Sequence, residues 1–245
     1  MKWNDTPIRK ISLSITNFCN AGCPQCDRIN PNGCGTAEWL PLVQWSIDDF
    51  KKAFPKETLD ELDEIQFCGT WGDPMMLKDL FPMCEYIIDT SNCRIEITTN
   101  GSIRDEDYYW KLGILCGKRL KMYFDIDGIN QEMHSHYRRK CNLQKTLDNM
   151  KTLSETWSTP MAQTVVFEHN RPHLKEIEQL AKDYGAKYWR HFDSNRFRES
   201  DTFNFIDENG KEQVLRKWVS VLVVNGKTMN LLLLTQTDKF FHVVI

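Results

Sequence analysis

The chain has 245 residues, enough for one domain of about 200 to 250 residues with a sizeable core and a short appendage. Hydrophobic residues make up 41% of the sequence and charged residues 27%, which excludes a largely disordered chain. The 31 Lys and Arg residues nearly balance the 34 Asp and Glu residues, so the formal charge is −3. The sequence therefore has no excess of basic residues that would predict binding to nucleic acid or to an anionic membrane.

The sequence does not predict a secretory signal or a membrane span. Residues 1–13 carry charges among their apolar residues, and the longest apolar stretch, 218–234, is interrupted by Asn225-Gly226-Lys227. We therefore expect a cytoplasmic protein. Its nine cysteines then lie in a reducing compartment, where thiols serve metals, catalysis or packing more often than disulfides.

Six segments have the character of β-strands. The first shows strict alternation, with Ile11, Leu13 and Ile15 separated by Ser12 and Ser14, and it leads directly toward Cys19. The other five are bounded by turn residues. They span residues 64–68, 94–99, 121–126, 162–167 and 186–192.

Helical spacing separates these strands. Ser46 followed by Asp49 predicts a capped helix that ends before Pro55, and apolar stripes predict helices over 80–88, 143–153 and 174–184. Gly185 is suited to end the last of these, and residues 105–116 predict a further helix more weakly. Six strand and helix units predict an α/β fold, a partial (β/α)6 barrel of the TIM type with mainly parallel strands.

The rhythm of the sequence changes after residue 194. We expect a core domain over residues 1–194 and a short C-terminal appendage over 195–245. Within the appendage, Asn225-Gly226 between two apolar runs predicts a β-hairpin.

Three cysteines follow the first strand in a C-x3-C-x2-C pattern: Cys19, Cys23 and Cys26. A [4Fe–4S] cluster usually takes four thiolates, so a local set of three predicts a cluster with one iron open to another ligand. The alternative is a structural zinc site, for which Cys34 would supply the fourth thiolate of a non-catalytic binding module. Iron–sulfur reconstitution separates the two.

This pattern resembles the defining motif of the radical S-adenosylmethionine (SAM) superfamily. The resemblance implies that SAM binds the open iron and is cleaved reductively to a 5′-deoxyadenosyl radical, which abstracts a hydrogen atom from a substrate. It also implies an electron donor such as flavodoxin or ferredoxin. The residues Trp71-Gly72-Asp73-Pro74, preceded by Gly69, resemble the superfamily's Gly-Gly-Glu-Pro segment, with Trp71 in place of the first glycine and Asp73 in place of glutamate.

Further polar residues stand at the predicted strand ends, where ligands of such folds bind. By resemblance, Thr99, Asn100 and Asp125 are expected to meet SAM, and Arg138 to pair with its carboxylate. Asp125, Asp127 and Glu168 are the candidates for moving protons during catalysis. Gln25 stands where many members carry an aromatic residue, so Phe18 or Trp71 would have to face the adenine.

The resemblance extends over residues 8–193 and is strongest to the branch that often carries a C-terminal SPASM or twitch extension. No cysteine follows Cys141, which excludes an auxiliary cluster held by thiolates of the appendage. This branch favours a peptide or protein substrate, with a nucleoside or small metabolite as the alternative. A partner-dependent scaffold without activity is a third hypothesis, motivated by the apolar residues 231–234.

Overall fold

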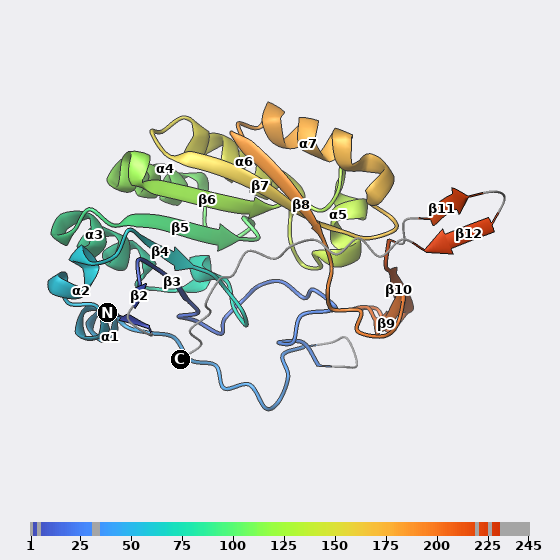
Figure 1. Cartoon of the computed structure of the whole chain (residues 1–245), viewed down its shortest axis with the longest axis horizontal. Helices are drawn as coiled ribbons and strands as arrows, with labels where there is room; N and C mark the ends of the chain where they lie inside the picture. Colours follow the sequence, from blue (N-terminus) through green and yellow to red (C-terminus); the bar gives the residue numbers. More distant parts are fainter. Residues whose placement is uncertain (1, 4–5, 31–34, 219–220, 225–226, 231–245) are drawn as a thin grey trace.

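The structure is a computed structural model that describes residues 2–3, 6–30, 35–218, 221–224 and 227–230. Its centre is a sheet of six parallel strands, which lie side by side in chain order (Figure 1). The strands are β3 (Lys10–Leu13), β4 (Glu64–Phe67), β5 (Arg94–Thr99), β6 (Leu120–Asp125), β7 (Thr159–Val166) and β8 (Tyr188–Asp193). All six predicted strands are confirmed.

Helices connect these strands and cover one face of the sheet (Figure 1). The helices are α1 (Ile47–Ala53), α2 (Lys56–Asp60), α3 (Leu80–Thr90), α4 (Glu106–Cys116), α5 (Gln131–Tyr137), α6 (Leu143–Ser154) and α7 (Leu174–Asp183), with 3₁₀ turns at Pro74–Met76, Gly117–Arg119 and Arg171–His173. The order of the sheet runs from β3 to β8 without closing, so β3 and β8 are its edges. The prediction of a partial, parallel barrel is confirmed.

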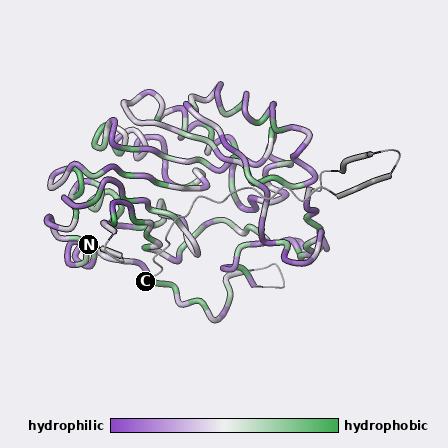
Figure 2. The backbone as a smooth tube through the Cα atoms, viewed as in Figure 1, coloured by the Kyte–Doolittle hydropathy of each residue, from purple (hydrophilic) through white to green (hydrophobic). Residues whose placement is uncertain are grey.

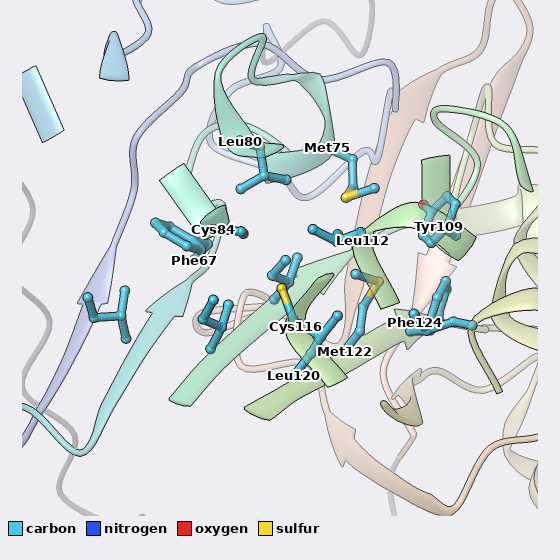
Figure 3. Close-up of a cluster of buried hydrophobic side chains, with 14 of the residues drawn as sticks. Phe67, Met75, Leu80, Cys84, Tyr109, Leu112, Cys116, Leu120, Met122 and Phe124 are labelled. Atoms are coloured by element: carbon cyan, nitrogen blue, oxygen red, sulfur yellow. The ribbon is translucent and has the colours of Figure 1, made fainter. Parts of the chain in front are cut away.

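The main hydrophobic core lies between the sheet and these helices, and Figure 3 shows part of it. On β5, Ile95 and Ile97 are fully buried, whereas Glu96 between them points to the other face and is half-buried. Met122 and Phe124 on β6 are fully buried in the same core. Figure 2 shows hydrophobic and hydrophilic segments alternating along the helices, as expected for helices with one buried face.

The predicted helix signals have their expected geometry. Ser46 and Asp49 form a capping box at the start of α1, in which each side chain accepts a hydrogen bond from the other residue's backbone N–H. Gly185 adopts a left-handed conformation (φ 91°) after α7, where a side chain would collide with Ser154. The weaker prediction over residues 105–116 is confirmed as α4.

The C-terminal part of the chain contains two antiparallel hairpins, β9 (Thr202–Ile206) with β10 (Glu212–Arg216), and β11 (Val221–Val224) with β12 (Lys227–Asn230). The second is the predicted hairpin, whose turn residues Asn225 and Gly226 lie outside the described residues. The first was not predicted. A short ladder near the N-terminus joins β1 (Lys2–Trp3) to β2 (Thr6–Pro7). Within the described residues, no helix is long and apolar enough to cross a membrane.

Candidate active site

A cavity of about 700 Å³ lies at the carboxyl ends of the six parallel strands, and we call it the inner cavity. The segment after each of the six strands contributes at least one lining residue. Parallel strands place their carboxyl ends at one edge of a sheet, so side chains that are far apart in sequence meet there. This edge of the sheet is therefore where the candidate functional side chains lie close together.

All three cysteines of the motif line the inner cavity. They stand on the loop after β3, which is fixed by backbone hydrogen bonds from the Cys26 N–H to the Cys23 carbonyl (3.0 Å) and from the Gly22 N–H to the Arg139 carbonyl (2.9 Å). Burial raises the pKa of the Cys23 thiol to about 11 and that of the Cys19 thiol further still. Both thiols are thus protonated in the apoprotein, and binding of a metal centre would release their protons.

The donor set fits an iron–sulfur cluster. Three soft thiol donors from one loop face a cavity far larger than a single ion, which matches cysteine ligation of a [4Fe–4S] cube. In the part of the chain that the structure describes, no three or more His, Cys, Asp or Glu side chains are gathered tightly enough to hold one metal ion. Cys34, the fourth ligand of the alternative zinc site, lies outside the described residues.

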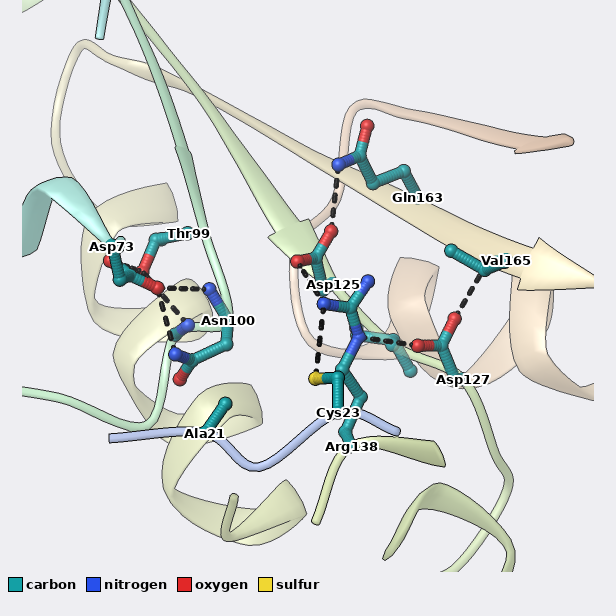
Figure 4. A network of polar contacts seen from close by, with 12 residues as sticks. Ala21, Cys23, Asp73, Thr99, Asn100, Asp125, Asp127, Arg138, Gln163 and Val165 are labelled. Atoms are coloured by element: carbon teal, nitrogen blue, oxygen red, sulfur yellow. Dashed lines mark hydrogen bonds and ion pairs between the residues drawn. The ribbon is translucent and has the colours of Figure 1, made fainter. Parts of the chain in front are cut away.

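Asp73 is the centre of a hydrogen-bond network across three segments (Figure 4). Its carboxylate accepts bonds from the Thr99 hydroxyl (2.8 Å), from the backbone and side-chain N–H groups of Asn100 (2.8 and 2.7 Å), and from the Met75 N–H (3.0 Å). Burial nevertheless raises its pKa to about 6. The Asn100 side chain also donates to the side-chain oxygen of Asn20 (2.8 Å), so the network reaches the cysteine loop.

The loop after β4 needs its two glycines. A Cβ at Gly72 would lie 2.0 Å from the Thr16 carbonyl oxygen, and one at Gly69 would lie 1.6 Å from the Gly72 carbonyl oxygen. The chain turns back on itself here and passes against the segment after β3. Trp71 lines the inner cavity and contacts Trp39 edge to face, at 6.1 Å between ring centroids.

Arg138 is held between two carboxylates beside the cysteine loop (Figure 4). Its guanidinium lies 2.9 Å from Asp125 and 2.6 Å from Asp127, and it approaches the Cys23 sulfur at 3.9 Å. Burial raises the pKa of both carboxyl groups, that of Asp127 to about 6, while the guanidinium opposes the shift. Gln163 donates to the other oxygen of Asp125 at 2.7 Å.

Most of the predicted site residues line the inner cavity. Those that do are Cys19, Cys23, Cys26, Gly69, Trp71, Gly72, Asp73, Thr99, Asn100, Asp125 and Arg138. Three do not: Pro74 starts the 3₁₀ turn behind the loop, Asp127 is fully buried behind Arg138, and Glu168 is exposed.

Glu168 does not line the inner cavity. It follows the end of β7 by two residues, and its side chain is 56% exposed and lies 3.6 Å from Arg216 on β10. Asp127 is fully buried, and its two oxygens contact the Arg138 guanidinium and the Val165 N–H. We therefore propose that it positions Arg138.

Several lining residues were not in the predicted set. Gln163, Arg28, Arg171 and Arg196 line the inner cavity, together with the end of β8. Gln163 was detectable as a polar residue inside an otherwise apolar strand, whereas the three arginines carry no signal in one sequence that separates them from surface arginines. Gln25 does not line this cavity, and its side chain accepts a hydrogen bond from the Ser194 hydroxyl at 2.7 Å.

Comparisons with known proteins agree with this geometry. The family model for the Radical SAM superfamily matches residues 13–183. The bacteriocin biosynthesis protein AlbA of Bacillus subtilis is 24% identical over 82% of this chain and 40% of its own length. The probable GTP 3′,8-cyclase of Methanocaldococcus jannaschii is 24% identical over 73% of this chain and 57% of its own. The chain thus spans about half the length of these two relatives.

A solved structure shares the fold. Streptococcus suis SuiB, bound to its precursor peptide SuiA, superposes with a TM-score of 0.61 over 77% of this chain and 40% of SuiB, at 10% sequence identity. The family match covers well over half of the chain and includes the cysteine loop and the loops after β4, β5 and β6. The chain belongs to the radical SAM superfamily of enzymes.

Proposed function

We propose that Cys19, Cys23 and Cys26 bind one [4Fe–4S] cluster and that SAM occupies the inner cavity beside it. When bound, the reduced cluster and SAM together supply a 5′-deoxyadenosyl radical that abstracts a hydrogen atom from a substrate. The observation that carries this proposal is that all three cysteines and the polar ends of the neighbouring strands line one cavity. A cluster held by three thiolates leaves one iron for the cofactor.

In this proposal, residues of the chain orient SAM and enclose it beside the cluster. Asp73 presents a carboxylate to an ammonium group, and its Thr99 and Asn100 donors fix its direction. Arg138 holds a positive charge next to Cys23, which stabilises an anionic centre there, and Asp125 keeps the guanidinium in place. Trp71 supplies a flat apolar face at the cavity wall for a heteroaromatic ring.

A peptide or protein is the proposed substrate class. AlbA serves bacteriocin biosynthesis, and the superposed SuiB binds a precursor peptide, which supports a peptide for this chain as well. A nucleoside or small metabolite is the second candidate, supported by the similarity to the probable GTP 3′,8-cyclase. We further propose a cytoplasmic location and a low-potential electron donor such as flavodoxin or ferredoxin.

Anaerobic reconstitution with iron and sulfide tests the proposal. The wild-type protein should become brown, absorb near 400 nm and, with dithionite and SAM, yield 5′-deoxyadenosine. Cys23→Ala should bind little iron and yield none, because two thiolates do not retain the cube. Cys84→Ala is the matched control, since this thiol is buried in the main core away from the cavity.

A colourless protein with one zinc per chain would contradict the proposal and favour the binding module. A protein that binds the cluster but does not cleave SAM would favour the hypothesis of a partner-dependent scaffold without activity. A rise in 5′-deoxyadenosine with an added peptide, but not with a nucleoside, would identify the substrate class.

A further inference from the structure

A second cavity, of about 340 Å³, lies on the other side of the cysteine loop, and we call it the outer cavity. Its lining comes from four segments: residues 19–22 and 28–29, residues 35–36, residues 139–140 after α5, and Glu208 between β9 and β10. Cys19, Ala21 and Arg28 line both cavities. The cysteine loop therefore borders both cavities and separates the proposed cofactor site from the outer cavity.

The outer cavity is positively charged. Arg28, Arg139 and Lys140 contribute three cations, and Glu208 is the one carboxylate among the lining residues. Glu208 is paired with Arg139 at 3.0 Å. Lys140 also helps to lower the pKa of Glu208, while Arg28 is buried and donates to the Asn17 carbonyl oxygen at 3.0 Å. Three cations and one carboxylate leave this lining with an excess of positive charge. Because the chain as a whole carries a charge of −3, this is a local reversal of sign.

Two of these cationic residues, Arg139 and Lys140, lie directly against the cysteine loop. The Arg139 carbonyl accepts the Gly22 N–H at 2.9 Å, and a Cβ on Gly22 would lie 3.6 Å from the Lys140 side chain. Lys140 itself is exposed and has a left-handed backbone (φ 63°), which is uncommon for lysine. Backbone conformations of this kind persist where the surrounding structure holds them and are concentrated at functional sites.

We propose that the outer cavity is the docking site of an acidic protein that carries one electron at a time, and that the electron enters through the wall formed by Cys19, Ala21 and Gly22. The inference rests on the proposed function, because it needs a cluster on the three cysteines. In this step one electron leaves the reduced carrier, which becomes oxidised, and reduces the cluster. No covalent bond forms or breaks, and no proton moves.

Two physical reasons favour this side of the loop. The inner cavity has to hold cofactor and substrate and exclude water, so a folded carrier cannot approach the cysteines from there. On the outer side, Cys19, a proposed cluster ligand, itself lines the outer cavity. A positive patch also raises the association rate of a negatively charged partner, by 10-fold to 1,000-fold in well-steered pairs.

Stopped-flow reduction of the reconstituted holoprotein tests the proposal, with the bleaching of cluster absorbance near 400 nm as readout. A photoreduced flavodoxin, an acidic protein, is the probe, and dithionite is the small-molecule reference. In Lys140→Glu the second-order rate with flavodoxin should fall about tenfold at low ionic strength, whereas the rate with dithionite should stay unchanged. Lys175→Glu on α7 makes the same charge change on an exposed lysine that lines neither cavity, and it should behave as wild type.

Salt provides a second readout. The flavodoxin rate of the wild type should fall steeply with ionic strength, and that of Lys140→Glu should be nearly flat. Equal flavodoxin rates for the two lysine variants would overturn the docking site while leaving the cluster intact. A parallel loss with dithionite would also overturn it, because Lys140 would then act on the cluster itself. Failure of the wild-type holoprotein to form a cluster would instead contradict the proposed function.

Discussion

The carboxylate of Asp73 accepts hydrogen bonds from Met75, Thr99 and Asn100 and still lines the inner cavity. These donors stabilise its charged form, but burial opposes them and raises its pKa from 3.8 to about 6. Because the pKa is higher in the folded protein, the contribution of this group to stability is complete below pH 3.8 and is lost as the pH rises through about 6. An ammonium ligand beside the carboxylate would stabilise its charged form and lower this pKa again.

This balance predicts a pH dependence of SAM binding. Asp73 becomes protonated as the pH falls through about 6, and a neutral carboxyl group does not pair with an ammonium. The affinity of the reconstituted protein for SAM should fall by up to about tenfold for each pH unit below 6. In Asp73→Asn the affinity should be low and nearly independent of pH. Calorimetric titration of both proteins between about pH 5 and pH 8 provides the measurement, and equal slopes would remove Asp73 from the site.

The residues of the site were more predictable than their contacts. Most of the residues that the cysteine spacing and the strand-end motifs identified do line the inner cavity. They did not reveal that Arg138 is already paired with Asp125 and Asp127, because that pairing depends on how α5 returns the chain to the end of β6. The contact of Glu168 with Arg216 was equally hard to predict, because Arg216 lies on a hairpin that follows much later in the chain.

At the scale of secondary-structure elements, the β9–β10 hairpin packs against the cysteine loop. Phe205 and Leu215 are buried in a small second core with Ala21 and Cys23, against which Cys19 and Cys26 also pack. The His136 ring contacts the Val214 carbonyl oxygen at 3.2 Å, which ties the hairpin to α5. The hairpin thus packs against the cysteine loop, and Glu208 between its two strands lines the outer cavity.

Leu215→Ala tests this role of the hairpin. Leu215 is fully buried, so its truncation should lower the free energy of unfolding by about 2 to 5 kcal/mol. It should also accelerate cluster loss in air, because the second core packs directly against the cysteines. Ile206→Ala, at an exposed position of the same hairpin, should change little. Denaturant unfolding and timed iron release measure the two effects, and equal iron release from both variants would contradict the shielding role.

The elements that alternation and helical spacing predicted are those that contribute to the large core, where a regular apolar face is required. The β9–β10 hairpin escaped prediction because only Phe205 and Leu215 of its ten strand residues are buried. A turn signal was nonetheless present at Asn209-Gly210, where Gly210 has a φ of 77°. The Asp207 side chain accepts the N–H groups of Asn209 and Lys211 in this turn.

At the scale of the whole molecule, the boundary proposed after residue 194 divides a packed region. The Arg196 guanidinium donates to the Gln25 carbonyl oxygen, next to Cys26, at 2.8 Å. The Glu168 N–H also donates to the Arg216 carbonyl at 3.0 Å, which joins the end of β7 to β10. We therefore propose that the cooperative unit of the core extends to about residue 218.

Two shortened chains distinguish these boundaries. A chain of residues 1–218 should melt close to the full chain, because it keeps every contact between the hairpin and the cysteine loop. A chain of residues 1–194 loses Phe197, Phe205 and Leu215, each a buried side chain worth about 1.5 to 3 kcal/mol. Since a whole domain is stable by only about 5 to 15 kcal/mol, the shorter chain should be largely unfolded or melt at a much lower temperature. Calorimetry of the apoproteins measures this difference, and equal melting of the two chains would return the boundary to residue 194.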